Sequence, residues 1–156
     1  MIPRVGQGYD IHPFSRDPER RMVMAGVVLP GPGLAGHSDA DVVAHAVCDA
    51  LLGAAGLGDI GTHFPDSDPE FAGADSMELL ARVVATVTES YEIGNVDVTV
   101  LLEAPKIAPH RGEMERRLAA VVGAPVSLKA KRGEGLGPVG RKEGVACLAV
   151  ALVVAR

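Results

Sequence analysis

The sequence contains no tryptophan, and it has only three phenylalanines and two tyrosines in 156 residues. It also lacks a cluster of basic residues, and its formal net charge is −5. A nucleic-acid-binding protein normally presents a positive patch to the phosphate backbone, so we expect no nucleic-acid partner. The 19 glycines and 11 prolines instead indicate many tight turns and sites built from loops.

Cysteine and long apolar runs are also scarce. Cys48 and Cys147 are far apart and form no Cys-x-x-Cys pair, a pattern typical of buried thiols in a reducing compartment. The first residues, MIPRVGQGYDIH, lack the apolar core of a signal peptide. The longest apolar run, Val145 to Ala155, is shorter than the roughly 20 residues that cross a bilayer. We therefore expect a cytoplasmic protein with no membrane partner.

The length and the apolar content of 47% predict a single domain that covers residues 1–156, and the motifs described below make it a catalytic one. Apolar alternation and apolar runs predict strands, whereas apolar residues at helical spacing predict helices. The expected strands cover 2–9, 22–29, 95–103, 126–131 and 144–154, and the expected helices cover 38–55, about 76–87 and 110–122. This order predicts a two-layer α+β domain, with a mixed four-stranded sheet and helices on one face.

The last expected strand, 144–154, is apolar on both faces. One face can cover the helices, but the chain has no fourth long helix to cover the other. A homo-oligomer that packs these sheets together is the simplest solution.

The stretch from residue 36 to 49, GHSDADVVAHAVCD, is the most unusual part of the chain. Ser38 and Asp41 resemble a capping box at the start of a helix. His37, Asp41, His45 and Asp49 then recur at four-residue spacing, which places them on one stripe of that helix. Because a solvated helix face would rather carry Lys, Arg and Glu, we interpret this stripe as one wall of an active site.

The first expected strand ends in Asp10-Ile11-His12, whose first and third side chains point to the same side of extended backbone. Such a pair also occurs as a turn aspartate with an incidental histidine. Together with His45, however, it offers three ligands for Zn²⁺ and leaves a fourth position open to substrate. Mn²⁺ or Fe²⁺ would suit the same donors. A site made of His37, Asp41 and His45 on the helix alone is an alternative geometry; we prefer the first, because two rigid elements supply its ligands.

Further along, residues 58–69 are too rich in Gly, Pro and Asp for regular structure. We expect them to form either a lid or substrate loop, or a plain surface loop. Several cations are available for a phosphorylated substrate, and Glu134 could hold a second, phosphate-bridging ion. These cations are Lys106, Lys129, Lys131, Arg132 and Arg141. The residues alone therefore point to metal-assisted phosphate chemistry.

Several long motifs resemble one family over essentially the whole chain. They are G-x-G-Y-D-I-H, the block from Gly36 to Gly61, F-P-D-S-D-P, A-D-S, G-N-V-D-V-T-V, A-P-K-I-x-P-H and G-R-K-E-G-V-A. In this order they are similar to the 2-C-methyl-D-erythritol 2,4-cyclodiphosphate synthases of the non-mevalonate isoprenoid pathway.

The resemblance implies a cyclisation of 4-diphosphocytidyl-2-C-methyl-D-erythritol 2-phosphate. The 2-phosphate attacks the β-phosphorus, the cyclic diphosphate closes and CMP leaves. The resemblance also implies a homotrimer with sheets around a central channel and active sites between subunits. That channel can carry an isoprenoid diphosphate near Arg141.

The resemblance assigns roles to individual residues. Asp10, His12 and His45 would hold the Zn²⁺-like ion, and Glu134 a Mg²⁺ or Mn²⁺ on the substrate diphosphate. His37 and Ser38 would contact phosphate at the helix N-terminus, with His37 stabilising developing charge. The methylerythritol pocket would comprise Asp59, Ile60, Gly61, Phe64, Pro65, Asp66, Ser67 and Asp68. The cytidine pocket would run from Leu102 to Ala108 and include Ala104, Pro105, Lys106 and Ile107.

One segment departs from the family pattern. Threonines that touch the diphosphate are common before the glutamate, but this chain has Lys131, Arg132 and Gly133 there. Either Arg132 replaces them as a charged catalytic phosphate contact, or Lys131 and Arg132 turn outward. Pro138 also stands where an aromatic residue is frequent.

Two rival functions are a non-catalytic trimer that binds metal, CMP or isoprenoid diphosphate, and a metal phosphohydrolase.

Overall fold

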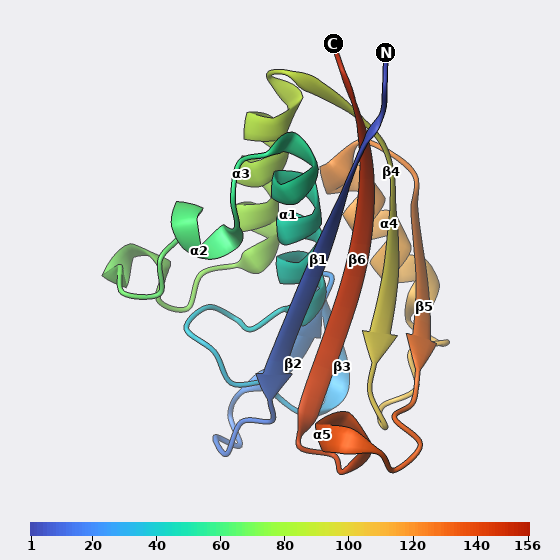
Figure 1. Cartoon of the computed structure of the whole chain (residues 1–156). Helices are drawn as coiled ribbons and strands as arrows, with labels where there is room; N and C mark the ends of the chain where they lie inside the picture. Colours follow the sequence, from blue (N-terminus) through green and yellow to red (C-terminus); the bar gives the residue numbers. More distant parts are fainter.

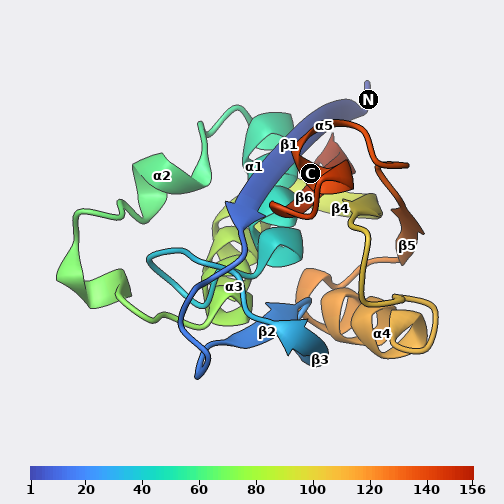
Figure 2. The same cartoon turned by 90° about the horizontal axis from the view of Figure 1, so that it is seen from below.

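A four-stranded mixed sheet forms one layer of the computed structural model, which describes all 156 residues (Figure 1). Its strand order is β1-β6-β4-β5; β6 runs antiparallel to both neighbours, and β4 runs parallel to β5. The helices α1, α3 and α4 lie together behind this sheet, as both views show (Figures 1 and 2). The predicted α+β fold with a mixed four-stranded sheet is confirmed. The elements are β1 (Arg4–Pro13), β2 (Arg21–Met24), β3 (Val27–Pro32), α1 (Val42–Ala55), α2 (Ile60–His63), the 3₁₀ helix η1 (Pro69–Phe71), α3 (Ser76–Thr88), β4 (Tyr91–Leu101), α4 (Arg111–Val122), β5 (Val126–Lys131), α5 (Gly137–Gly140) and β6 (Gly144–Ala155).

The apolar run 22–29 forms two strands of a hairpin rather than the single strand that we predicted. Strands β2 and β3 pair through the turn residues Ala25 and Gly26, whose φ angles are 52° and 71°. Two consecutive left-handed residues match the twist of a tight hairpin, and Gly supplies one of them without steric cost. The hairpin forms a separate two-stranded sheet.

Helix α1 begins later than the capping-box pattern predicted. Its N-cap is Asp41, whose side chain accepts a hydrogen bond from the backbone N–H of Ala44. Ala40, just before it, has a φ of 57°, which is the left-handed conformation and cannot belong to a right-handed α-helix. His37 and Ser38 therefore lie in the preceding loop, and the four-residue stripe along one helix is wrong. Gly56, in the left-handed conformation, ends the helix as expected.

Two glycines in β1 let α1 pack directly on the sheet. A Cβ atom built on Gly6 would lie 2.0 Å from the carbonyl oxygen of Ala50, and one on Gly8 would lie 1.8 Å from that of Ala46. Only the absence of a side chain at these positions permits such close backbone contact. The face of α1 that bears His45 is thereby held against the strand that bears Asp10 and His12.

The sheet face opposite the helices carries apolar side chains that this chain leaves exposed. Val5, Tyr9 and Ile11 on β1 are 65%, 54% and 42% exposed, and Val150 on β6 is 41% exposed. The homo-oligomer that covers this face stays a prediction. None of the helices has the length and apolar character that a membrane-spanning helix requires.

Both chain ends lie at the same end of the sheet, where Arg4 pairs with Val153 (Figure 1). Helix α5 and the carboxyl-terminal half of β1, which bears Asp10 and His12, lie toward the opposite end.

Asp41 joins the hairpin to α1 and should contribute strongly to stability. It is fully buried, and its carboxylate accepts hydrogen bonds from the N–H groups of Ala25 (2.9 Å), Gly26 (2.8 Å) and Ala44 (3.0 Å). Burial raises the pKa of Asp41 to about 6, although these three donors favour the charged form.

We expect Asp41→Ala to lower the free energy of unfolding by about 3 kcal/mol, because it removes a cap and leaves buried donors unpaired. Urea denaturation at neutral pH measures the change. Asp75→Ala is the matched control: Asp75 caps α3 from an exposed position, so its loss should cost only about 1 kcal/mol. Equal losses in the two variants would contradict the role given to Asp41.

Candidate functional site

Asp10, His12 and His45 converge on one point. The Oδ2 atom of Asp10 lies 2.8 Å from Nε2 of His12 and 3.0 Å from Nδ1 of His45, and the two ring nitrogens are 3.2 Å apart. Ligand atoms around a tetrahedral zinc ion lie about 3.3 Å from one another, so this cluster already has nearly the required spacing. These three side chains therefore form a potential metal-binding site. The alternative set on the helix alone, with His37 and Asp41, is wrong because neither residue lies on α1.

The surroundings direct lone pairs into this cluster. Nδ1 of His12 lies 2.9 Å from the carbonyl oxygen of Ala35, which only accepts, so Nδ1 carries a proton and a neutral His12 would offer the lone pair of Nε2 to a metal ion. Burial alone would lower the pKa of His12, but its hydrogen bond with Asp10 and the negative charge of Asp10 raise it overall. Burial alone would raise the pKa of Asp10, but hydrogen bonds with both histidines lower it. A carboxylate and two imidazoles at this spacing are donors that fit a divalent cation.

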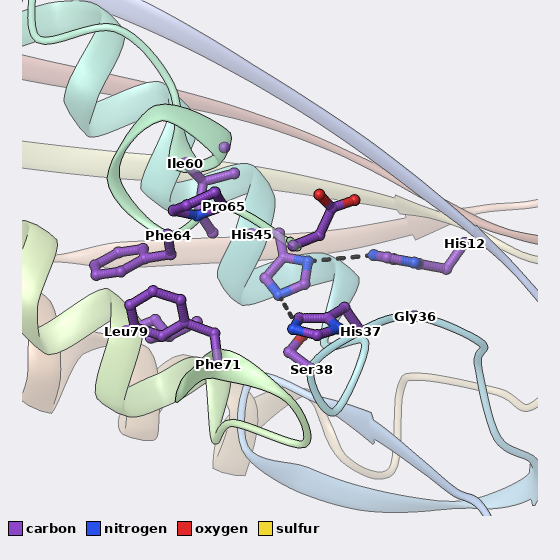
Figure 3. Close-up of a pocket in the computed structure, with 12 residues that line it drawn as sticks. His12, Gly36, His37, Ser38, His45, Ile60, Phe64, Pro65, Phe71 and Leu79 are labelled. Atoms are coloured by element: carbon purple, nitrogen blue, oxygen red, sulfur yellow. Dashed lines mark hydrogen bonds between the residues drawn. The ribbon is translucent and has the colours of Figure 1, made fainter. Parts of the chain in front are cut away.

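A cavity of about 420 Å³ opens beside the cluster (Figure 3). His12, His37, Ser38 and His45 form its polar end. The rings of Phe64 and Phe71, with centroids 5.3 Å apart and planes at 72°, lie with Leu79 at the other end (Figure 3). Its lining residues are His12, Gly36, His37, Ser38, His45, Ile60, Gly61, Phe64, Pro65, Asp66, Phe71 and Leu79. A ligand with a charged group at the polar end and a small carbon skeleton at the apolar end would fit this cavity.

The segment that closes this cavity is more ordered than its composition predicted. Asp59 caps the short helix α2 and accepts hydrogen bonds from the N–H and the hydroxyl of Thr62. Asp49, on α1, accepts a hydrogen bond of 2.7 Å from the N–H of Ile60 and so ties α2 to α1. The prediction that residues 58–69 have no regular structure is therefore wrong, because they contain α2 and the start of η1.

Not every predicted pocket residue lines this cavity. Ile60, Gly61, Phe64, Pro65 and Asp66 do, whereas Asp59, Ser67 and Asp68 do not. Asp68 instead caps η1, and its carbonyl oxygen accepts a hydrogen bond of 3.1 Å from Nε2 of His37. This contact holds the exposed His37 ring at the rim of the cavity.

A second cavity, of about 230 Å³, contains most of the predicted cytidine-pocket residues. It lies beyond the ends of β4 and β5, at the sheet edge opposite β1, and shares no lining residue with the first cavity. Its lining residues are Leu102, Glu103, Pro105, Lys106, Ile107, Ala108, Arg111, Ala130, Lys131 and Arg132. Ala104 lies outside it and lines a neighbouring hollow of about 510 Å³ with Phe14, Pro30 and Lys142.

The loop after β5 is held by a contact that the sequence did not reveal. Oε1 of Glu103 accepts a hydrogen bond of 2.5 Å from the N–H of Gly133. Glu134 is exposed in the left-handed conformation, with a φ of 54°. Arg141, also exposed, donates to Glu143 at 2.7 Å. Neither Glu134 nor Arg141 reaches the metal cluster within one chain.

Sequence reasoning missed several residues around the cluster. Gly36, Phe71 and Leu79 line the first cavity, and Leu79 appeared only as a core residue of a helix. Ser76 is hydrogen-bonded to His45 and donates its hydroxyl proton to Asp39, although Ser76 is 31 positions from His45 and 37 from Asp39 in the chain. The only signal for Ser76 was its place in the A-D-S motif before α3.

Residues 3–154 match the YgbB family, and the chain belongs to that family. It is similar to proteins named 2-C-methyl-D-erythritol 2,4-cyclodiphosphate synthase: that of Bordetella petrii is 55% identical over 155 residues, which are 96% of this chain and 94% of the relative. It is also 54% identical to part of the "Bifunctional enzyme IspD/IspF" of Anaeromyxobacter dehalogenans, with 96% of this chain matching 39% of that protein.

Among solved structures, the fold is similar to "IspF (Plasmodium falciparum) CDP complex", with a TM-score of 0.85 and 33% identity over 99% of this chain and 97% of that one. The resemblance inferred from the motifs is thus confirmed, as is the expectation that the chain is an enzyme of a lyase family.

Proposed function

We propose that the chain cyclises 4-diphosphocytidyl-2-C-methyl-D-erythritol 2-phosphate to 2-C-methyl-D-erythritol 2,4-cyclodiphosphate and releases CMP. The observation that carries this proposal is the Asp10, His12 and His45 cluster at the polar end of a cavity, in a chain similar to synthases over almost its whole length. The relatives, which are named as synthases, do not favour the alternative of a non-catalytic binding protein.

The reaction forms one P–O bond and breaks another. An oxygen of the 2-phosphate attacks the β-phosphorus, and the bond from that phosphorus to the oxygen bridging to the α-phosphorus breaks. The electron pair of the broken bond leaves on CMP. No protein nucleophile is required, and holding both reacting groups in one bound substrate lowers the entropic barrier.

Asp10, His12 and His45 would hold one divalent cation per subunit, which we propose to be Zn²⁺, with Mn²⁺ as the alternative. When bound, such an ion polarises a phosphoryl oxygen and offsets the repulsion between two phosphates. His37 and Ser38 line the same end of the cavity and would donate hydrogen bonds to phosphate oxygens. The apolar end, with Ile60 and Phe64, would exclude water from the methylerythritol skeleton.

Arg132 and Glu134 would act on the diphosphate from the loop after β5. Arg132 and Lys131 line the second cavity beside Lys106, where positive charge would attract a nucleotide phosphate. Glu134 would help to hold a Mg²⁺ or Mn²⁺ that arrives with the substrate. Leu102 to Ala108 would surround the cytidine, and Gly133 would lie with Lys131 and Arg132 at the diphosphate.

We further propose that the enzyme is a homotrimer with active sites between subunits. The two cavities lie at opposite edges of the sheet of one chain, so a neighbouring subunit would bring the second cavity to the metal cluster. The exposed apolar row on β1 and β6 would pack around the central channel. An isoprenoid diphosphate would bind in that channel near Arg141. The free, buried Cys48 and Cys147 support a place in the reducing cytoplasm.

An assay of the purified protein tests this function. Incubation with the diphosphocytidyl substrate and Mg²⁺ should yield equimolar CMP and cyclic diphosphate, which phosphorus NMR and mass spectrometry distinguish. Chelation of the resident ion should abolish the product, and Zn²⁺ or Mn²⁺ should restore it. Linear phosphate products would indicate a hydrolase, and CMP binding without turnover would indicate the non-catalytic protein.

A further inference from the structure

A chain of hydrogen bonds connects the outer nitrogen of His45 to a carboxylate that does not belong to the metal cluster. Nε2 of His45 lies 2.8 Å from Oγ of Ser76, the first residue of α3. The Ser76 hydroxyl in turn makes a short hydrogen bond to Oδ1 of Asp39, in the loop before α1. Ser76 is fully buried, and neither Ser76 nor Asp39 lines the cavity.

The partners of Asp39 fix the direction of these bonds. Its carboxylate receives the N–H of Asp41 (3.1 Å), the N–H of Ser76 (3.1 Å) and the Ser76 hydroxyl. Because a carboxylate only accepts, Ser76 must give it the single hydroxyl proton. The oxygen of Ser76 then has only lone pairs for His45, so Nε2 of His45 must carry a proton.

This order decides which nitrogen of His45 is available in the cluster. Nδ1, the atom that faces Asp10 and His12, is hydrogen-bonded to Asp10 in the structure. A neutral imidazole has one proton, so with that proton on Nε2 the lone pair of Nδ1 would be free for an ion bound between these groups. Ser38, with Oγ 3.1 Å from the same Nε2, is a second acceptor. Ser38 lines the cavity and is not bonded to a carboxylate, so nothing forces its hydroxyl to accept from His45. The direction of the hydrogen bond is therefore set by Ser76.

We propose that Asp39 and Ser76 are positioning residues that hold His45 in the tautomer that binds the metal ion, and thereby set the metal affinity of the cluster. The inference rests on the metal-binding role proposed above but not on the cyclisation. A carboxylate behind a metal-bound histidine both orients the ring and makes its free nitrogen a stronger ligand. Here that effect passes through one hydroxyl.

Asp39→Asn is the most informative variant because it preserves shape and reverses the hydrogen bonding. Every partner of Asp39 is a donor, so either orientation of the asparagine amide sets its NH₂ group against one of them. When the NH₂ group faces the Ser76 hydroxyl, it donates to that oxygen, and the hydroxyl proton turns to Nε2 of His45. Nε2 then accepts, the ring proton moves to Nδ1, and this tautomer cannot bind the metal ion through Nδ1. Ser76→Ala removes the intermediate hydroxyl instead.

We expect both variants to bind Zn²⁺ about 10- to 100-fold more weakly than the unaltered protein, measured by competition with a chromophoric chelator. In the zinc-loaded protein, ¹⁵N-edited NMR should show the Nε2 proton of His45 protected from exchange with water, and Ser76→Ala should speed that exchange. Asp75→Ala is the control, because it removes the cap of α3 one residue from Ser76 without touching His45. It should leave zinc affinity unchanged.

Three results would overturn the proposal: no uptake of Zn²⁺ by the unaltered protein, affinities within twofold of it in both variants, or an equal loss in Asp75→Ala. The last result would mean that the position of α3 alone matters. Zinc affinity is measured without substrate, so a protein that binds zinc as expected but makes no cyclic diphosphate would refute the proposed function and leave this inference intact.

Discussion

His45→Ala should reduce the rate of cyclic diphosphate formation by about 10³-fold or more. The variant keeps Asp10 and His12 but loses the only cluster ligand on α1, so the cation is held by two groups on one strand. An ion that polarises a phosphoryl oxygen supplies several kcal/mol of transition-state stabilisation, and each 1.36 kcal/mol lost costs about tenfold in rate. The rate is measured with saturating Mg²⁺ and added Zn²⁺, and zinc content is measured in parallel.

The fold should survive this change. His45 is partly buried at the edge of the cavity, and its loss removes no apolar core side chain. Sedimentation should therefore give the same oligomer as for the unaltered protein. His110→Ala is the matched histidine control, because His110 begins α4 without any side-chain capping bond. Near-normal turnover in His45→Ala would refute the metal assignment.

Gly8→Ala should prevent folding, or lower the free energy of unfolding by about 5 kcal/mol, at the upper limit of single substitutions. The added carbon would lie 1.8 Å from the carbonyl oxygen of Ala46 and 2.8 Å from the backbone nitrogen of Ala50. Both are backbone atoms of α1, so no side chain can rotate away, and the helix must move off the sheet. Urea denaturation or, for an insoluble variant, the yield of soluble protein measures the effect.

Gly53→Ala provides the control within the same contact region. Gly53 lies in α1 and is exposed, and the nearest atom to an added carbon is 3.8 Å away. Alanine is the better helix former, so this variant should gain about 0.5 to 1 kcal/mol. A stable Gly8→Ala protein would show that α1 does not rest on β1 as closely as described.

The sequence predicted the sheet well because its signals are local. Alternation in 126–131 and the long apolar run 144–154 match β5 fully and β6 within one residue. It failed at residues 36–42, where Ser38 and Asp41 have the right types for a capping box. Asp41 is instead the N-cap itself, because it also bonds to the hairpin turn at Ala25 and Gly26, a contact between segments that no local pattern contains.

The metal cluster was predictable for a similar reason. Asp10 and His12 alternate on one strand, so their common direction follows from strand geometry. Their meeting with His45 required only that β1 and α1 pack together. Asp39 and Ser76 were not predictable, because their role depends on how the start of α3 meets the loop before α1. Aspartate and serine in such places are ordinary capping residues in most sequences.

The common position of the two chain ends has a consequence for fused proteins. Arg4 and Val153 pair at one end of the sheet, whereas Asp10 and His12 lie six to eight residues further along β1. At about 3.3 Å per residue, this places roughly 20 Å or more between either terminus and the metal cluster. A second domain or an affinity tag can therefore be joined at either end without covering that cluster. The relatives in which a similar segment forms 39% of a bifunctional enzyme are compatible with this geometry.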